Sequence, residues 1–160
     1  MDKKIYEHAL FNGAKFGFFC ICWTSFFYVL NSKNILPQPS FYTVSLLLFM
    51  ILFSFIVTYI FKYSSFFSFK TYFSICFLFL AISLIILRVY YFLLYNYFDP
   101  HLISEYFDFY ITNFDDYIIG DKNNFMNNFS FLKQLQAYVF SLIPCALYSA
   151  LISLLVIKIK

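Results

Sequence analysis

The chain has 160 residues, of which 62% are apolar, 26% are aromatic and only 12% are charged, and its formal net charge is +3. A soluble globular domain carries about 25% charged residues because it needs them to cover its surface. The low charge excludes a soluble enzyme, a nucleic-acid-binding protein and a disulfide-stabilised secreted domain, and it predicts an integral membrane protein.

The uncharged stretches are long enough to cross a bilayer. Lys33 and Lys62 enclose 28 uncharged residues, and Lys133 and Lys158 enclose 24. A membrane-spanning helix needs about 20 mostly apolar residues, whereas a β-barrel strand alternates apolar and polar side chains over roughly ten residues. We therefore predict an all-α integral membrane protein, a single domain over residues 1–160, with transmembrane helices at about residues 16–30, 41–61, 72–96 and 135–157.

The connections follow from local composition. No small-residue cleavage site follows the first apolar stretch, so we expect the first helix to remain as an anchor. Pro37 and Pro39 cannot continue a helix, which predicts a turn at residues 31–40. Serines and two lysines predict the second connection at residues 62–71. Tyrosines near the end of the third helix predict an interfacial belt, formed by Tyr90, Tyr91, Tyr95 and Tyr97.

The basic residues predict the orientation in the membrane. With four crossings, seven basic residues lie on the side of both termini and three lie on the opposite side. Because lysine and arginine are enriched in cytoplasmic loops, we predict that both termini are cytoplasmic. The long loop of residues 97–134 is then outside, and it carries six of the eight acidic residues.

This outer loop contains a predicted amphipathic helix at about residues 100–118. Asp99 and Pro100 suit the N-cap and the first helical position. Apolar and aromatic side chains then recur every three or four residues, at Ile103, Tyr106 or Phe107, Tyr110, Phe114 and Tyr117. We expect this helix to lie on the outer membrane surface or to cap the bundle. The polar residues 121–128, after Gly120, are expected to be mobile.

Arg88 is the charged residue predicted to lie within the membrane, about eight positions or 12 Å below the outer end of the third helix. A charge at this depth is costly and indicates a functional site with a partner. Pro144 frees the carbonyl group of Phe140 from helical hydrogen bonding. We expect Arg88 to donate to that carbonyl and to Ser141, or to reach Asp99. The alternative is that its long side chain only extends to the outer interface.

Small residues indicate where helices approach each other. Ala9, Gly13 and Gly17 recur every four residues in the first helix, and the fourth helix has a similar row at Ser141, Cys145, Ser149 and Ser153. Small side chains let helix backbones come close in lipid. We therefore predict that the first and fourth helices pack together through these faces, and the alternative is a homodimer formed through one of them.

No constellation for catalysis or metal binding is evident. The four cysteines fall within predicted spans, where we expect them to behave as small apolar residues. His8 and His101 lie on opposite sides of the predicted membrane. We expect no catalytic residue, no metal, no cofactor and no enzymatic activity. The absence of acidic residues from the predicted spans also disfavours proton-coupled transport.

Residues 90–110 resemble a family of small four-helix membrane proteins found mainly in Bacteroidota, known as domain of unknown function 4199. The resemblance extends to a glycine pair, a Phe-Asp-Pro step and a proline in the last helix, matched here by Gly13, Gly17, Phe98, Asp99, Pro100, Phe140 and Pro144. It implies the four-helix topology and a location in the bacterial inner membrane, and it implies no known activity.

Two functions are consistent with these features. The first is a non-enzymatic inner-membrane protein that associates with the lipid bilayer or with a partner membrane complex. The alternative is an oligomeric subunit of a small-solute transporter or channel that uses Arg88 as an anion or gating site. A channel requires a polar lumen lined by several helices, whereas association requires one contact face.

Overall fold

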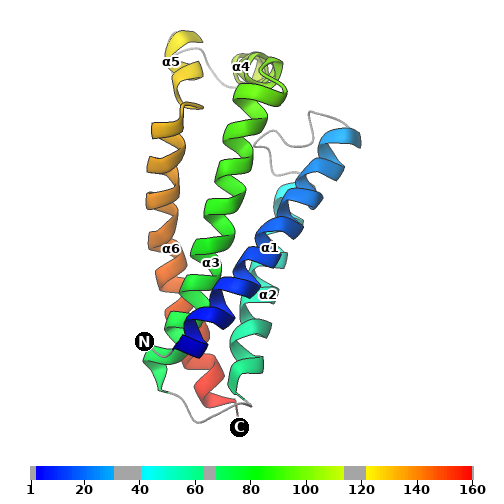
Figure 1. Ribbon diagram of the computed structural model, residues 1–160. Helices are drawn as coiled ribbons and strands as arrows, with labels where there is room; N and C mark the ends of the chain where they lie inside the picture. The colour runs from blue at the N-terminus through cyan, green and yellow to red at the C-terminus, as the bar shows by residue number, and fades with distance from the viewer. Residues whose placement is uncertain (1–2, 31–40, 63–67, 114–121, 160) are drawn as a thin grey trace.

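The computed structural model describes residues 3–30, 41–62, 68–113 and 122–159, and every regular element within these ranges is helical (Figure 1). The elements are α1 (Lys3–Leu30), α2 (Phe41–Lys62), α3 (Phe69–Leu93), the π-helical turn η2 (Leu94–Phe98), α4 (His101–Asn113), α5 (Lys122–Asn127) and α6 (Phe131–Lys158). Within these ranges four helical segments, α1, α2, α3 with η2, and α6, are long and apolar enough to cross a membrane. The prediction of an all-α fold with four such helices is confirmed.

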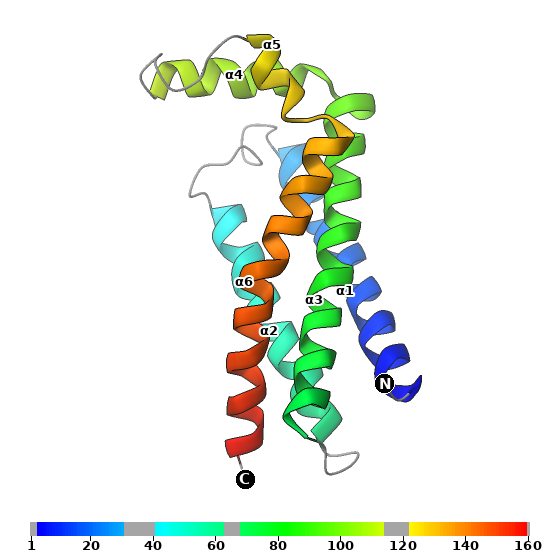
Figure 2. The same cartoon turned by 90° about the vertical axis from the view of Figure 1, so that its left-hand side faces the viewer.

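The bundle is organised around α3. Figure 1 shows α3 between α1 and α6, while α2 contacts all three of these helices. The first and last described residues, Lys3 and Ile159, lie at the same end of the bundle, here called the terminal end. At the opposite end, α4 lies across the ends of the long helices (Figure 2). We call this the α4 end.

Helix α1 begins at Lys3, thirteen residues before the predicted start at residue 16. Its buried face already includes Ile5 and Ala9, which precede the next buried residue, Gly13, at intervals of four residues, about one turn each. Lys3 also pairs with Glu7 across one turn, at 3.8 Å. Hydropathy locates the uncharged part of a helix, but the packed face continues through a charged segment because its charges lie on the opposite side.

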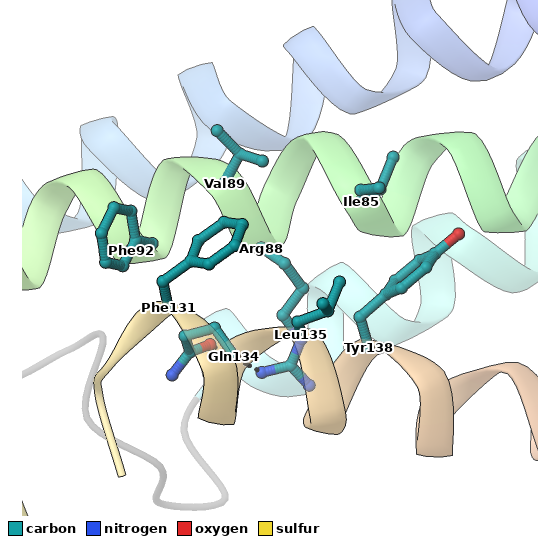
Figure 3. Close-up of a pocket in the computed structure, with 8 residues that line it drawn as sticks. All are labelled: Ile85, Arg88, Val89, Phe92, Phe131, Gln134, Leu135 and Tyr138. Carbon is teal, nitrogen blue, oxygen red and sulfur yellow. Dashed lines mark hydrogen bonds between the residues drawn. The ribbon is translucent and has the colours of Figure 1, made fainter. Parts of the chain in front are cut away.

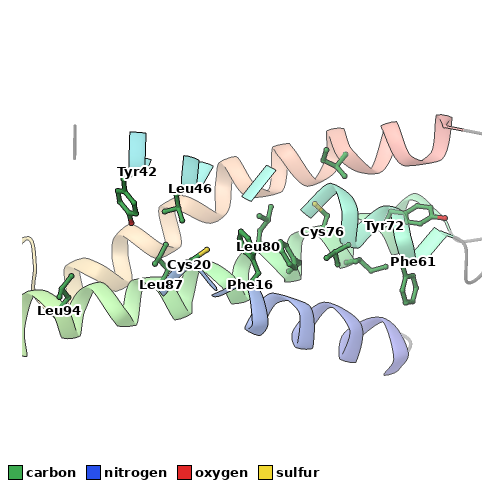
Figure 4. Close-up of a cluster of buried hydrophobic side chains, with 14 of the residues drawn as sticks. Phe16, Cys20, Tyr42, Leu46, Phe61, Tyr72, Cys76, Leu80, Leu87 and Leu94 are labelled. Carbon is green, nitrogen blue, oxygen red and sulfur yellow. The ribbon is translucent and has the colours of Figure 1, made fainter. Parts of the chain in front are cut away.

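The core includes buried side chains from all four long helices, and those of α1, α2 and α6 pack around those of α3 (Figure 4). Phe79 and Ile75 of α3 are almost completely buried. The Phe79 ring lies 5.3 Å from the ring of Phe16 on α1, and Val156 of α6 is also fully buried. The predicted spans therefore associate through interdigitated apolar side chains.

The glycines of α1 bring it close to α3. A Cβ atom on Gly13 would lie 2.9 Å from the carbonyl oxygen of Phe79, and one on Gly17 would lie 2.9 Å from Cβ of Ile86. The Ser83 hydroxyl lies between the carbonyl oxygens of Phe79, at 2.7 Å, and Gly13, at 3.0 Å, and donates to this pair. The predicted packing of the first helix against the fourth is therefore wrong, because small residues permit close approach without specifying which helix approaches.

The small residues of α6 face the interior of the same bundle. Ser149 and Ser153 are fully buried, whereas Ser141 and Cys145 are half-buried. The Ser149 hydroxyl lies near the Cys76 thiol of α3 but forms no hydrogen bond of normal geometry with the described residues. Ser149 and Ser153, like the glycines of α1, therefore contribute to packing within the chain. The alternative homodimer contact stays a prediction.

A π-helical turn ends the third span. The Asp99 N–H donates to the carbonyl oxygen of Leu94 at 2.8 Å, five residues earlier. Pro100 follows and has no N–H with which to extend this pattern. Helix α4 then begins at His101, one residue after the predicted start, and the predicted residues 114–118 lie outside the described ranges.

Residues Lys122–Asn127 form the short helix α5, where we expected a mobile polar segment. Phe125 explains the difference, because its ring packs against Phe107 at 5.3 Å, Phe129 at 5.6 Å and Tyr106 at 5.9 Å. A single aromatic side chain thus anchors this asparagine-rich segment to α4.

Candidate functional site

A cavity of about 380 Å³ lies at the α4 end of the bundle, between α2, α3 and α6. Small-molecule sites typically measure roughly 300–1,000 Å³. Leucine and methionine side chains line part of the wall, and the remaining lining includes one charged and several polar residues, Tyr42, Arg88, Tyr91, Tyr95, Tyr106 and Gln134. We call this space the polar cavity. Residues of α2, α3, α4 and α6 all contribute to its lining.

Three hydroxyl groups form a chain from the polar cavity to α1. Thr24 donates to the carbonyl oxygen of Cys20 at 2.8 Å. Because each hydroxyl carries one proton, the Thr24 oxygen must accept from Tyr42, at 2.9 Å. Tyr42 must then accept from the hydroxyl of Tyr91, with which it is in contact. The backbone carbonyl at the end of the chain therefore sets the direction of all three hydrogen bonds.

Arg88 of α3 lies opposite Gln134 of α6. Its Nη1 atom is 3.5 Å from Oε1 of Gln134, which is at the outer limit for a hydrogen bond. Figure 3 shows the two side chains facing each other. The amide nitrogen of Gln134 lies 3.3 Å from the carbonyl oxygen of Asn128, which orients this side chain. Among the described residues no carboxylate lies within 4.0 Å of the guanidinium. Most of its five N–H donors therefore have no acceptor in the described part of the chain.

Arg88 and Gln134 also line a second, apolar cavity of about 90 Å³ between α3 and α6. Figure 3 shows the apolar side chains around it, Ile85, Val89, Phe92, Phe131, Leu135 and Tyr138. We call this space the apolar crevice. Val89 and Phe131 are 47% and 59% exposed, so the crevice opens onto the side of the bundle. The Arg88–Gln134 pair thus separates a polar space from an apolar one.

The predicted partners of Arg88 are not the ones the structure brings to it. Ser141 donates to the carbonyl oxygen of Tyr138 in its own helix, at 2.6 Å. Asp99 accepts a hydrogen bond from Tyr28 of α1, at 2.8 Å. Gln134 is the partner of Arg88 in place of the predicted Ser141 or Asp99.

The register of α6 against α3 explains this correction. The side-chain amide of Asn96 donates to the carbonyl oxygen of Phe129 at 3.0 Å, which aligns the two helices at the α4 end. Arg88 consequently lies level with Gln134. The predicted partners Phe140, Ser141 and Pro144 lie about 9–15 Å farther along α6. Phe140 and Pro144 are exposed, and neither forms a hydrogen bond with Arg88 in the described part of the chain.

Aromatic rings cover the polar cavity at the α4 end. The Tyr106 ring of α4 lies 5.4 Å from Phe129 and 6.3 Å from Tyr95. Burial raises the pKa of Tyr106 well above its usual range, nearby Tyr95 and Tyr110 raise it further, and the charge of Arg88 partly opposes them. Tyr106 is therefore a neutral hydrogen-bond donor at neutral pH.

A single hydrogen bond ties α1 to the start of α4. The Tyr28 hydroxyl donates to Oδ2 of Asp99, the residue between η2 and α4 that precedes Pro100. Below it, the hydroxyl groups of Ser25 and Tyr90 lie 2.7 Å apart. The Asp99 side chain therefore binds α1 and does not form the predicted N-cap.

We expect the Tyr28–Asp99 bond to contribute about 1 kcal/mol of coupling free energy, because hydrogen bonds to a charged acceptor exceed the average but this pair is partly exposed. Unfolding of Tyr28→Phe, Asp99→Asn and the double variant in detergent measures the coupling. Tyr97→Phe, which changes an exposed tyrosine at the same end, is the matched control. Additive effects of the two substitutions would show that the bond contributes nothing.

The described cysteines and histidines do not form a cluster with one another or with acidic residues. The four cysteines are free, with Cys20 and Cys76 buried and Cys22 exposed. His8 lies 3.3 Å from the carbonyl oxygen of Val57 and packs against Phe61. In the described ranges no three His, Cys, Asp or Glu side chains are grouped closely enough to hold a metal ion.

The family model of a protein of unknown function, DUF4199, matches residues 12–158. The chain belongs to the DUF4199 family. The match includes all of α2, α3, α4 and α6 and most of α1, and it confirms the resemblance found in the sequence. No curated protein and no solved structure matches the chain.

In this DUF4199 chain the sequence identified Arg88 but missed most of the side chains around it. Gln134 was assigned to the loop, although α6 begins at Phe131. Tyr91 and Tyr95 were assigned to an interfacial belt, whereas both line the polar cavity. A lining assembled from separate helices has no characteristic spacing in the sequence, and the run of tyrosines was its only local signal.

Proposed function

We propose that the chain is a non-enzymatic, multi-pass protein of the bacterial inner membrane that associates with membrane lipid. The observation that carries this proposal is the exposure of its long apolar helices, since at most 33% of the residues in each candidate span are buried within the bundle. Side chains such as Phe140 and Leu147, 70% and 68% exposed, are stabilised by hydrocarbon and not by water. A partner membrane complex is the alternative occupant of these faces.

The distribution of lysines supports an orientation with both termini in the cytoplasm. Lys4, Lys70 and Lys158 belong to the terminal end of the bundle, and Lys122 and Lys133 to the α4 end. Positive residues are enriched on the cytoplasmic side of membranes. With this orientation the polar cavity belongs to the outer half of the bundle.

The chemistry of the polar cavity supports a binding role over a catalytic one. The hydroxyl chain from Tyr91 through Tyr42 to Thr24 ends on the carbonyl oxygen of Cys20. An activated nucleophile requires an adjacent base or a depressed pKa. A backbone carbonyl supplies neither, so these hydroxyls position helices and do not form a nucleophile.

A transporter or channel subunit is the second candidate, favoured by the presence of Arg88 in a polar cavity. The lining residues of this cavity that lie nearest the middle of the bundle are the apolar Met50 and Leu84. In the terminal half, Thr58 and Ser153 donate to carbonyl oxygens of their own helices. These hydroxyls are satisfied locally and do not extend the polar lining, which favours lipid association over a continuous pathway.

The proposal is tested by topology mapping. In a variant with the four native cysteines replaced by alanine, single cysteines are introduced as Lys4→Cys, Lys70→Cys and Lys122→Cys. A membrane-impermeant maleimide applied to spheroplasts should label only Lys122→Cys, and permeabilisation should expose the other two positions. Alkaline carbonate should leave the protein in the membrane.

Other outcomes would contradict parts of the proposal. Labelling of Lys4→Cys from outside would reverse the orientation, and release by carbonate would overturn integral membrane insertion. Stoichiometric co-purification of one other membrane protein, with loss of the bound lipid, would favour the partner complex over lipid.

A further inference from the structure

We propose that Arg88 and Gln134 form a binding site for the phosphate group of an anionic phospholipid. The head group occupies the polar cavity, and part of an acyl chain occupies the apolar crevice between α3 and α6. This inference rests on the proposed lipid association, and it adds the class of lipid and the residues that bind it.

The charge of Arg88 is the first argument. Arg88 lies ten residues before Phe98, the end of the candidate span, which is about 15 Å along a helix. A charge at membrane depth is costly unless it is paired. Among the described residues its hydrogen-bond partner is the neutral side chain of Gln134, at 3.5 Å. An oxyanion supplied by a ligand neutralises the guanidinium and accepts two parallel hydrogen bonds from it.

Two further donors line the same cavity. Tyr95 and Tyr106 line the polar cavity, and the hydroxyl group of neither forms a hydrogen bond with another described residue. Tyr42 and Tyr91, in contrast, are engaged in the chain that ends on α1. Two neutral phenols and a guanidinium therefore surround one space, and a phosphate group has enough oxygen atoms to accept from all three.

The Arg88–Gln134 pair lines two different spaces, and this favours a lipid over a free anion as the ligand. One side faces the polar cavity, and the other faces an apolar crevice whose rim includes the exposed residues Val89 and Phe131. A phospholipid carries its phosphate next to its hydrocarbon chains, so it matches both spaces at once. A free oxyanion has no apolar part to occupy the crevice.

The experiment uses the full chain in non-ionic detergent and measures lipid binding by native mass spectrometry. Phosphatidylglycerol and phosphatidylcholine with the same acyl chains are the probes. We expect phosphatidylglycerol to bind at least tenfold more tightly, and Arg88→Met to reduce its affinity at least tenfold, to the level of phosphatidylcholine. Arg88→Lys should retain part of the preference, because a lysine keeps the charge without the bidentate geometry.

Lys133→Met is the matched control. It removes the same charge from an exposed position of α6, one residue before Gln134 and outside both cavities. We expect less than a twofold change in phosphatidylglycerol affinity. An equal loss in Lys133→Met and Arg88→Met would indicate general surface electrostatics and would overturn the proposed site.

A second variant keeps the proposal testable if Arg88→Met does not fold, as judged by helicity and elution. The double variant Tyr95→Phe with Tyr106→Phe keeps the charge and removes two donors, and we expect at least a threefold loss of phosphatidylglycerol affinity. Unchanged affinity would overturn the site, as would equal binding of the two lipids by the wild-type chain. Displacement of phosphatidylglycerol by an equal concentration of inorganic phosphate would overturn its assignment to a lipid.

These outcomes are separate from failure of the proposed function. A chain that remains in carbonate-washed membranes but binds both lipids equally would retain general lipid association and lose the specific site. Release of the chain by carbonate would instead overturn the proposed function itself.

Discussion

Replacement of Gly13 by leucine should separate α1 from α3 and lower the free energy of unfolding by about 3 kcal/mol, the upper range for overpacking a core. Even a Cβ atom at this position would lie 2.9 Å from the carbonyl oxygen of Phe79. Because this neighbour is backbone, it cannot rotate away, and the whole helix must move. The movement would also break the contact between Ser83 and the Gly13 carbonyl oxygen. Reversible unfolding in mixed detergent micelles, followed by circular dichroism, measures the loss.

Cys22→Leu is the matched control for this substitution. It enlarges a small residue of the same helix at a position that is exposed, so we expect a change of less than about 0.5 kcal/mol, as for surface substitutions in general. Gly17→Leu should cost about as much as Gly13→Leu, because a Cβ atom there would lie 2.9 Å from Cβ of Ile86, which is fixed to the backbone. Equal stability of the Gly13→Leu and Cys22→Leu variants would contradict the close α1–α3 contact.

Replacement of Phe79 by alanine should have the second largest effect, a loss of about 2–3 kcal/mol. Phe79 is the largest fully buried side chain in the described part of the chain, with 1% exposure, and its ring contacts Phe16 of α1. In water such a truncation costs about 3–5 kcal/mol, which includes both transfer and cavity terms. We expect less here because lipid is as apolar as the interior, so mainly the lost packing contacts remain. The same unfolding assay measures this loss.

Phe140→Ala provides the comparison for the Phe79 substitution. It removes an identical side chain from α6 at a position that is 70% exposed, where hydrocarbon of the bilayer or detergent fills the space. We expect a change below about 0.5 kcal/mol. A loss at Phe140 as large as that at Phe79 would indicate that the lateral face of α6 is also packed against protein.

The membrane-spanning helices were predictable because crossing a membrane depends only on residues that are neighbours in the sequence. Crossing hydrocarbon needs about 20 apolar residues in succession, and the spacing of charges along the chain shows where these are. The ends of the helices were less predictable. Helix α1 begins thirteen residues earlier than expected, since its packed face continues through Lys3–Glu7 with the charges pointing outward.

The candidate site was predictable only in part. Arg88 was conspicuous because a charge within an apolar stretch is rare and costly. Its partner was not, because the depth of Gln134 depends on how α6 slides along α3. The Asn96–Phe129 hydrogen bond marks this register. It joins the π-helical turn η2 to a residue just before α6, 33 positions later in the chain.

The sequence by itself determined that this protein is helical, that it has four helices able to cross a membrane, and that it belongs to the DUF4199 family. These properties depend on the free energy of transferring each segment from water to lipid and on motifs made of a few neighbouring residues. The tertiary structure alone decided that α1 packs on α3 through its glycines, that Ser149 and Ser153 are buried within the bundle, and that Arg88 meets Gln134 beside a tyrosine-lined cavity. Helix pairing in lipid has no hydrophobic difference to direct it, so it depends on the shapes of distant surfaces that no local pattern encodes.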